Sequence, residues 1–321
     1  MTTTFIKGLV DYRKKSDRPT VVTVGTFDGI HRGHQAILKT LRAESTRLDL
    51  EPVLLTFDPH PRVLVSPEDI PLLLTTIEEK EKFVPDFFDG TVLVLRFDDT
   101  LKEMSAEQFV GEILVEALGA RKVIVGHDHA FGRNRSGNIA ALKSLGEKHH
   151  FDVQVVQPVM HGGEPISSSR IRAAMRDDDY AGALEMLGHD YAIFGTVEKG
   201  IGLGRRLGFP TANIRYGLRK LLPREGVYSC WAQLGGRCWP GMMFIGRNYF
   251  NPQERISVEA NLFDFDDDVH GEEMMLYPTV YLRANRRFES TGRLAEQLNL
   301  DKENAMRIIE KEKKDVNRQR A

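Results

Sequence analysis

The stretch Val21–Leu38, VVTVGTFDGIHRGHQAIL, decides the fold of the first half of the chain. It opens on an apolar, β-branched run, which is typical of a buried parallel strand. Gly25 and Gly29 interrupt that run, and a helical pattern follows through Ile37 and Leu38. The stretch therefore predicts a strand, a glycine turn and the N-terminus of a helix that carries the pattern H-x-G-H.

The start of this helix has the chemistry of a phosphate site. A helix N-terminus presents unpaired N–H groups and partial positive charge. Gly33 lets a phosphate approach the backbone closely. His31 and His34 flank it and can donate hydrogen bonds to phosphate oxygens as charge develops. The simpler alternative is a tight turn with two surface histidines, but packing alone gives no reason for a glycine between them at this place.

The pattern resembles that of the H-x-G-H nucleotidyltransferase superfamily, which joins a nucleoside monophosphate to an acceptor phosphate. The longer form, GTFDGIHRGH, is similar to the FMN adenylyltransferase branch. The resemblance implies catalytic roles for His31 and His34. It also implies that ATP or its phosphates contact residues of the same loop, namely Gly25, Phe27, Asp28 and Gly33.

Length and composition limit the class of protein. A chain of 321 residues suggests two domains, and a net charge of -2 creates no field that would draw the protein to nucleic acid or membrane. The sequence shows no signal peptide and no apolar run of membrane-spanning length. Two cysteines fit a reduced, cytoplasmic protein with two buried or half-buried thiols, and a bridge between them is the alternative.

Strands and helices alternate after the opening stretch, which predicts a Rossmann-like domain with a doubly wound parallel sheet. Right-handed crossovers would bring the carboxyl ends of the strands to one rim, where Gly25, Asp58, Gly126 and the loop after Val156 would meet. The further strands are expected over residues 48–57, 91–97, 122–125 and 153–156, and the helices over 77–88, 105–118 and 139–150.

Two further segments of this rim carry polar residues. Loops after the second and fourth strands hold the candidates for binding flavin and adenine, which are Asp58, His60, Asp128 and Phe131. The segment ISSSRIR precedes a helix and offers Ser167 and Ser168 to phosphate, with Arg170 as a catalytic cation. A proline-stiffened loop and a plain capped helix are the structural alternatives. In the family this second segment reads I-S-S-T-x-I-R, so Ser169 stands in place of a threonine and keeps the hydroxyl.

The pattern changes near His189, which predicts domains over residues 1–188 and 189–321. Short alternating strands with frequent glycines indicate a small all-β barrel of the Greek-key kind. The strands are expected over 191–197, 226–233, 237–245, 257–265 and 273–282. A helix over about 291–298 and another from 302 would close the chain, with a solvated or disordered tail over 310–320.

A glycine-dense string, Gly195–Asn213, is the second motif of the chain. Such a loop can wrap phosphates with backbone N–H groups, but by itself it usually means turns. The full pattern G-x-x-L-G-F-P-T-A-N resembles the riboflavin kinase signature. The resemblance implies phosphate contacts from Gly202, Gly204 and Arg205, Mg²⁺ ligands in Thr211 and Asn213, and catalysis by Glu259.

Together the motifs resemble the prokaryotic bifunctional riboflavin kinase/FAD synthetase family. That resemblance implies phosphorylation of riboflavin to FMN and adenylylation of FMN to FAD, both with ATP and Mg²⁺, by a monomer or weak homo-oligomer. Two positions depart from the family pattern: the loop Gly246–Phe250, which usually has a proline and a threonine, and His270, which is usually a tyrosine.

Three other functions compete with this one. The barrel could be a flavin-binding or regulatory domain without kinase activity. The first domain could use another acceptor, such as a phosphopantetheine or a sugar phosphate, although such enzymes need no P-T-A-N module. Nucleic-acid binding through the arginine pairs is disfavoured by the net charge and by the lack of interleaved aromatic and basic residues.

Overall fold

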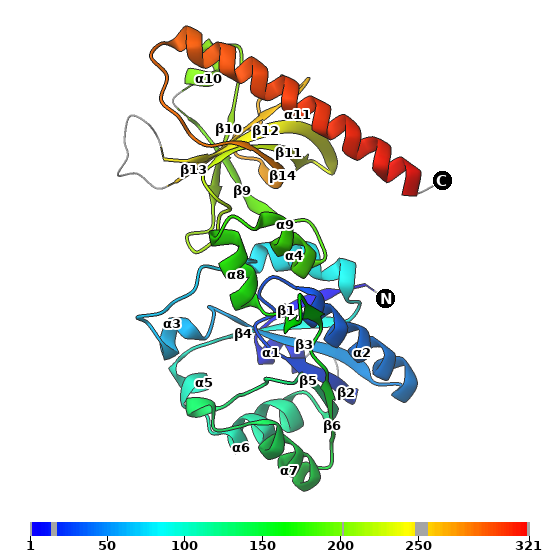
Figure 1. Ribbon diagram of the computed structural model, residues 1–321. Helices are drawn as coiled ribbons and strands as arrows, with labels where there is room; N and C mark the ends of the chain where they lie inside the picture. Colours follow the sequence, from blue (N-terminus) through cyan, green and yellow to red (C-terminus); the bar gives the residue numbers. More distant parts are fainter. Residues whose placement is uncertain (1, 14–17, 201, 248–255, 320–321) are drawn as a thin grey trace. The chain divides into compact units, whose positions relative to one another are not determined.

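A computed structural model describes residues 2–13, 18–200, 202–247 and 256–319 (Figure 1). The chain divides into two compact units, Met1–Ile171 with Met186–Gly188, and Arg172–Glu185 with His189–Ala321. The departing loop after Arg247 falls within 248–255, outside the described residues. Within the described ranges, no helix is long and apolar enough to cross a membrane.

The first unit is built on a six-stranded parallel sheet with the order β1-β4-β3-β2-β5-β6. From the central strand β2 the chain adds β3 and β4 on one side of the sheet, and then adds β5 and β6 on the other side. The order of strands therefore reverses between β2 and β5, and this topological switch point lies at the carboxyl end of β2. The strands are β1 (Thr4–Lys7), β2 (Thr20–Val24), β3 (Glu51–Asp58), β4 (Thr91–Arg96), β5 (Ala120–Gly126) and β6 (Asp152–Val156).

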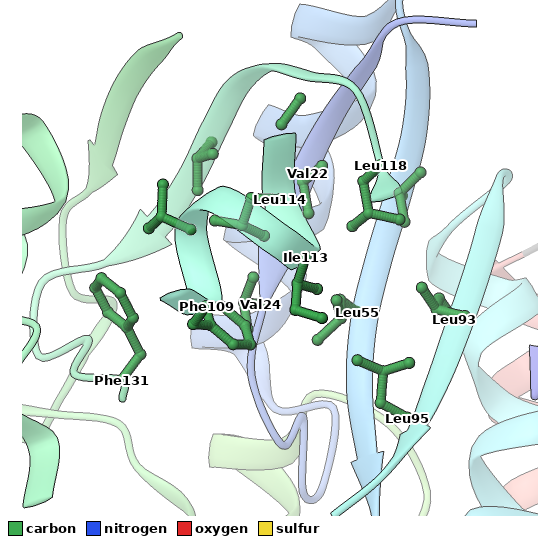
Figure 2. Close-up of a cluster of buried hydrophobic side chains, with 14 of the residues drawn as sticks. Val22, Val24, Leu55, Leu93, Leu95, Phe109, Ile113, Leu114, Leu118 and Phe131 are labelled. Carbon is green, nitrogen blue, oxygen red and sulfur yellow. The ribbon is translucent and has the colours of Figure 1, made fainter. Parts of the chain in front are cut away.

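Helices cover both faces of this sheet, which confirms the doubly wound arrangement. One face packs under η1 (Phe109–Ala117): its Phe109, Ile113 and Leu114 contact alternate strand residues such as Val22 and Leu55 (Figure 2). The opposite face packs against α2 (Arg32–Leu48). This helix contacts four neighbouring strands of the sheet, which are β3, β2, β5 and β6. The core on the η1 side joins residues of β2, β3, β4 and β5 to η1.

Local signals explain the ends of several helices. Thr76 and Glu79 form a capping box at the start of α4 (Ile77–Phe87), and Ser105 and Gln108 form another ahead of α6 (Ala106–Gln108). The segment that the sequence predicts as one helix over 105–118 continues as η1, which is π-helical. The other helices of this unit are α1 (Leu9–Arg13), α3 (Arg62–Val65), α5 (Asp99–Glu103), η2 (Arg133–Arg135) and α7 (Ile139–His149).

In the sequence between β6 and β9 come a small hairpin, β7 (Met160–His161) with β8 (Glu164–Pro165), and the helices α8 (Ser168–Arg176) and α9 (Tyr180–Leu187). The sequence pattern predicts one or two short helices here. The contacts of residues 172–185 belong to the second unit, so the chain does not divide simply at residue 188.

The second unit is a closed antiparallel barrel with the order β10-β13-β12-β11-β14-β9. Three consecutive strands, β11 to β13, form a meander, and β14 returns beside β11, which is the Greek-key arrangement. Its elements are β9 (Ile193–Glu198), α10 (Leu203–Arg206), β10 (Ala212–Tyr216), β11 (Gly226–Leu234), β12 (Arg237–Gly246), β13 (Ser257–Leu262), β14 (Glu273–Arg283) and α11 (Thr291–Gln319).

Several expectations for this unit need correction. The two terminal helices are one helix, α11, because Asp301 is buried in an ion pair with Arg283 and does not end the helix (2.7 Å between Arg283 Nη2 and Asp301 Oδ2). The strand expected over 257–265 ends at Leu262, where the chain turns through Asp264 at a φ of 54°. Both cysteines are free thiols, as expected, but only Cys230 is buried, and Cys238 is exposed.

Candidate active sites

The H-x-G-H segment lies at the switch point of the sheet, between the carboxyl ends of β2 and β5. His31 is the N-cap of α2, and its Nδ1 accepts a hydrogen bond from the His34 backbone N–H (3.4 Å). An acceptor role for Nδ1 leaves the proton of neutral His31 on Nε2, where it can be donated. The two imidazoles are stacked, with ring centroids 3.6 Å apart.

Burial keeps His34 neutral. Desolvation, with the nearby charges of His31 and Lys80, holds the pKa of His34 well below its usual range. Its Nδ1 is buried and lacks a hydrogen-bond partner among the described residues. The ring of Phe27 packs against that of His34, with centroids 4.8 Å apart. A neutral imidazole with an unused buried nitrogen suits a site that completes its hydrogen bonds when a ligand binds.

The loop that leads to this helix has an unusual backbone. Phe27 and Ile30 are both buried and adopt positive φ values of 47° and 42°, which non-glycine residues rarely do. A side chain on Gly33 would contact the His31 ring at 3.1 Å, and one on Gly25 would contact the Phe27 ring at 3.2 Å. The glycines are therefore needed for the placement of the two rings.

Phe27 and Asp28 are buried beneath this loop. Asp28 is 1% exposed, and its carboxylate accepts a hydrogen bond from the Thr75 N–H (2.9 Å). The backbone carbonyl of Asp28 accepts a hydrogen bond from Ser168 Oγ (2.8 Å), so the loop and the start of α8 are joined. The structure thus brings two of the predicted phosphate segments together, with Asp28 and Phe27 as buried supports.

Arg170 is engaged by backbone atoms. Its guanidinium donates to the carbonyls of Glu164 and Pro165 (2.9 Å each) and of His161 (3.2 Å), and it pairs with the Glu164 carboxylate (3.3 Å). These contacts clamp the β7–β8 hairpin. Ser167 Oγ accepts a hydrogen bond from the Arg170 N–H (3.3 Å) as a cap of α8.

The candidates for flavin binding lie in different environments. Asp58 is the last residue of β3 and Asp128 follows the carboxyl end of β5, and both are exposed. His60 Nδ1 accepts a hydrogen bond from the Arg62 N–H (3.2 Å). Phe131, in contrast, is 8% exposed and packs against Phe109 in the core of the unit, with ring centroids 5.8 Å apart. Its contacts are those of a residue that anchors the loop after β5.

The second site lies where β10 meets β13. Asn213 pairs with Glu259 in the register of these strands, and Thr211 Oγ1 lies 3.4 Å from Glu259 Oε2. Ser257 Oγ lies 3.4 Å from the other carboxylate oxygen. Glu259 shares a face of β13 with Asn261, as alternation predicts, and Asn261 Nδ2 donates to the carbonyl of Pro210 (2.7 Å). The P-T-A-N segment is thereby fixed beside the carboxylate.

Burial raises the pKa of Glu259, although hydrogen bonds from Thr211 and Ser257 oppose the shift. A half-buried carboxylate of raised pKa accepts a proton more readily than an exposed one. Thr211 is exposed and Asn213 is half-buried, so their oxygens remain accessible beside Glu259.

The glycine-dense loop before β10 is shaped by close approaches. Gly202 is the N-cap of α10 in the left-handed region, at a φ of 72°. A side chain on Gly204 would clash with the carbonyl of Phe209, and one on Gly200 would clash with the amide of Asn213. Arg205 is exposed in α10, and His270 is exposed, with its backbone N–H donating to Asp268 Oδ1 (3.1 Å).

Several residues that build these sites are not among the predicted site residues. Thr75 and Lys80 bind the loop of the first site, and Gly200, Ser257 and Asn261 position the second. Lys80 could have been found from helical spacing, because it shares the buried face of α4 with Phe83 and Val84.

Comparisons with known proteins match both halves of the chain. The family model for FAD synthetase matches residues 13–170, and that for riboflavin kinase matches residues 187–309. The bifunctional riboflavin kinase/FMN adenylyltransferase of Escherichia coli (strain K12) is 34% identical over 297 residues, covering 92% of this chain and 95% of the relative. The protein of the same description from Pseudomonas fluorescens is 35% identical, with 92% and 94% covered.

A crystal structure gives a similar result for the fold. The macrolide-efflux protein from Streptococcus pneumoniae superposes with a TM-score of 0.81 at 29% identity, over 94% of this chain and 97% of that chain.

Proposed function

The chain belongs to the family of bifunctional riboflavin kinase/FMN adenylyltransferases, and from this premise we propose which residues perform each reaction. As an enzyme of flavin-nucleotide synthesis, it makes FMN from riboflavin and ATP, and FAD from FMN and ATP. We assign adenylyl transfer to the H-x-G-H site and phosphoryl transfer to the barrel. In sequence, we assign adenylyl transfer to residues 1–188 and riboflavin phosphorylation to residues 189–321, although residues 172–185 contact the second unit.

The observation that carries the assignment is the half-buried carboxylate of Glu259 beside Thr211 and Asn213. Riboflavin presents an alcohol, whose proton must be accepted as it attacks the γ-phosphorus of ATP. Glu259 accepts that proton, the new O–P bond forms, and ADP leaves with the electrons of the broken bond. Gly202, Gly204 and Arg205 bind the nucleotide phosphates.

In the first unit the acceptor is the phosphate of FMN, which is already a competent nucleophile. One of its oxygens attacks the α-phosphorus of ATP, and pyrophosphate leaves. The reaction needs positioning and neutralisation of charge more than a base. The N-terminus of α2, with His31 and His34, supplies donors to the phosphate oxygens. Ser168 keeps the second segment next to this loop, Ser167 caps the start of α8, and Arg170 acts by holding the β7–β8 hairpin.

Thr211 and Asn213 fit a divalent cation, because a hydroxyl and an amide oxygen are hard ligands and lie next to a carboxylate. When bound with ATP, Mg²⁺ would neutralise charge on the phosphate oxygens. These two residues would hold it, and Gly200 leaves the space that the Asn213 amide occupies.

We also propose Asp58, His60 and Asp128 as contacts of the flavin or the adenine, with Phe131 supporting the loop that carries Asp128. A cytoplasmic location, a monomer or weak homo-oligomer, and partners limited to riboflavin, FMN and ATP complete the proposal.

The test separates the two reactions by substitution. His31→Asn keeps a favourable N-cap and removes only the imidazole, so FAD formation from supplied FMN should fall at least about 100-fold while riboflavin phosphorylation persists. Glu259→Gln should have the opposite effect. The control is Glu289→Gln, an exposed glutamate of the second unit. Loss of both reactions in either folded variant would refute the assignment of two sites.

A further inference from the structure

A buried lysine lies beside the loop of the first site. Lys80, in the first turn of α4, is 7% exposed, and its Nζ donates to the backbone carbonyl of Thr26 (2.6 Å). Burying an ammonium costs free energy unless hydrogen bonds and opposite charges offset it. Thr26 supplies the hydrogen bond, and three carboxylates, those of Asp28, Asp58 and Glu79, oppose the fall that desolvation causes in the lysine pKa.

The fold alone does not require a charge at this position. Phe83 and Val84 occupy the same buried face of α4, so an apolar side chain would fill the space at a lower cost of desolvation. What Lys80 adds is a bond to Thr26, which precedes the strained residue Phe27. The same helix start also binds the loop through Thr75, whose N–H donates to Asp28 Oδ1 (2.9 Å).

We propose that Lys80 is a positioning residue of the adenylyl-transfer site, which fixes the Thr26 carbonyl and supplies a positive charge near His34. The inference rests on the proposed assignment of adenylyl transfer to this site. Lys80 acts through the loop and the histidines, and it needs no contact with substrate. The charge adds to that of the α2 N-terminus, and both favour a polyphosphate at the rim.

The proposal has a consequence for the protonation of His34. The groups that oppose its protonation are His31, from the N-cap of α2, and Lys80, from α4. Desolvation acts in the same direction. Removing the lysine charge takes away one of these influences, so the pKa of His34 must rise. A lysine whose charge does not reach the imidazole would leave the titration of His34 unchanged when the fold survives.

The experiment compares Lys80→Met, Lys80→Gln and Lys80→Arg with Lys39→Met, an exposed lysine of α2. Histidine ring NMR signals are followed as the pH is lowered, with the His34 signal identified by its loss in His34→Gln. We expect the pKa of His34 to rise in Lys80→Met and in Lys80→Gln, because one nearby positive charge is removed. Lys80→Arg and Lys39→Met should titrate like the unchanged protein.

Turnover is measured on the same proteins. FAD formation from FMN should fall about tenfold or more in Lys80→Met, recover in part in Lys80→Arg, and stay unchanged in Lys39→Met. Circular dichroism reports whether the first unit, which carries Lys80, is folded, and riboflavin phosphorylation by the barrel is the internal reference. Lys80→Gln keeps a hydrogen-bond donor without charge, so it serves if Lys80→Met does not fold.

An unmoved His34 titration in folded Lys80→Gln would overturn the proposal, as would unchanged FAD formation in folded Lys80→Met. If the unchanged protein makes no FAD from FMN, the assignment of the reaction fails instead, and the titration still decides the role of the lysine.

Discussion

Replacing Gly200 with alanine tests the second site through a single added methyl group. A Cβ at this position would lie 2.8 Å from Asn213 Cγ and 3.1 Å from its Oδ1, with Nδ2 closer still. Carbon atoms in ordinary contact are about 3.5–4 Å apart, so the Asn213 amide must move by roughly 1 Å. Gly200 does not adopt a positive φ, so the backbone itself accepts alanine.

The size of the effect follows from that displacement. A misplacement of about 1 Å at a positioned group can cost about 100-fold in rate, which corresponds to roughly 2.7 kcal/mol in the activation free energy. The free energy of unfolding should change by less than about 1.5 kcal/mol, because Asn213 is half-buried and needs only a different rotamer. Gly200→Ala should therefore lose phosphorylation without losing the fold.

The assay measures FMN formation from riboflavin and ATP, with conversion of supplied FMN to FAD as the internal control. Gly292→Ala is the matched variant, since Gly292 is exposed in α11 and a Cβ there would have only an ordinary contact at 3.8 Å with Ser290 Oγ. It should keep both activities. Phosphorylation at the original rate in Gly200→Ala would refute the role given to the position of Asn213.

Three further predictions concern the pH profile, the core and the first site. Because burial raises the pKa of Glu259, its carboxylate gains a proton at a higher pH than an exposed glutamate does. As the pH is lowered, riboflavin phosphorylation should therefore begin to fall while the pH is still above 4.5. A pH–rate profile whose acid limb lies at or below pH 4.5 would contradict this. Asp301→Ala leaves Arg283 without its buried partner and should lower the free energy of unfolding by about 3 kcal/mol. A denaturant titration followed by tryptophan fluorescence measures this loss, and an unchanged free energy of unfolding would show the ion pair to be dispensable. Gly33→Ala should displace the His31 ring by a few tenths of an ångström and slow FAD formation from FMN roughly tenfold. An unchanged rate would show that the stacked pair of His31 and His34 tolerates this displacement.

The sequence contained enough to locate both motifs on their elements. The apolar run before Gly25 is β2, and the capping residues Thr76 and Ser105 begin helices, because these signals depend on neighbours in the chain. The sequence pattern does not predict β1, because its four residues form an edge strand in which only Ile6 is buried. β10 escaped because its start overlaps the glycine-dense string, and its polar residues face the second site.

Other features depend on partners far away in sequence. The run after Leu298 looks like a helix break, yet α11 continues because Asp301 binds Arg283, 18 residues earlier, and Asn299 Nδ2 donates to the Ala295 carbonyl (3.0 Å). Arg170 donates hydrogen bonds to backbone carbonyls of the β7–β8 hairpin, and the sequence pattern does not predict this hairpin. Local patterns predict elements, whereas the partner of a charged side chain is known only once the chain is folded.

The central claim, that one chain makes FMN at one site and FAD at another, is tested most directly by a chromatographic time course of the purified protein with riboflavin, ATP and Mg²⁺. The account predicts that FMN accumulates first and FAD follows it. If no product forms from riboflavin while supplied FMN is converted to FAD, the barrel is a binding or regulatory domain and the assignment of Glu259 is contradicted. If neither substrate gives a flavin product, both assignments are contradicted.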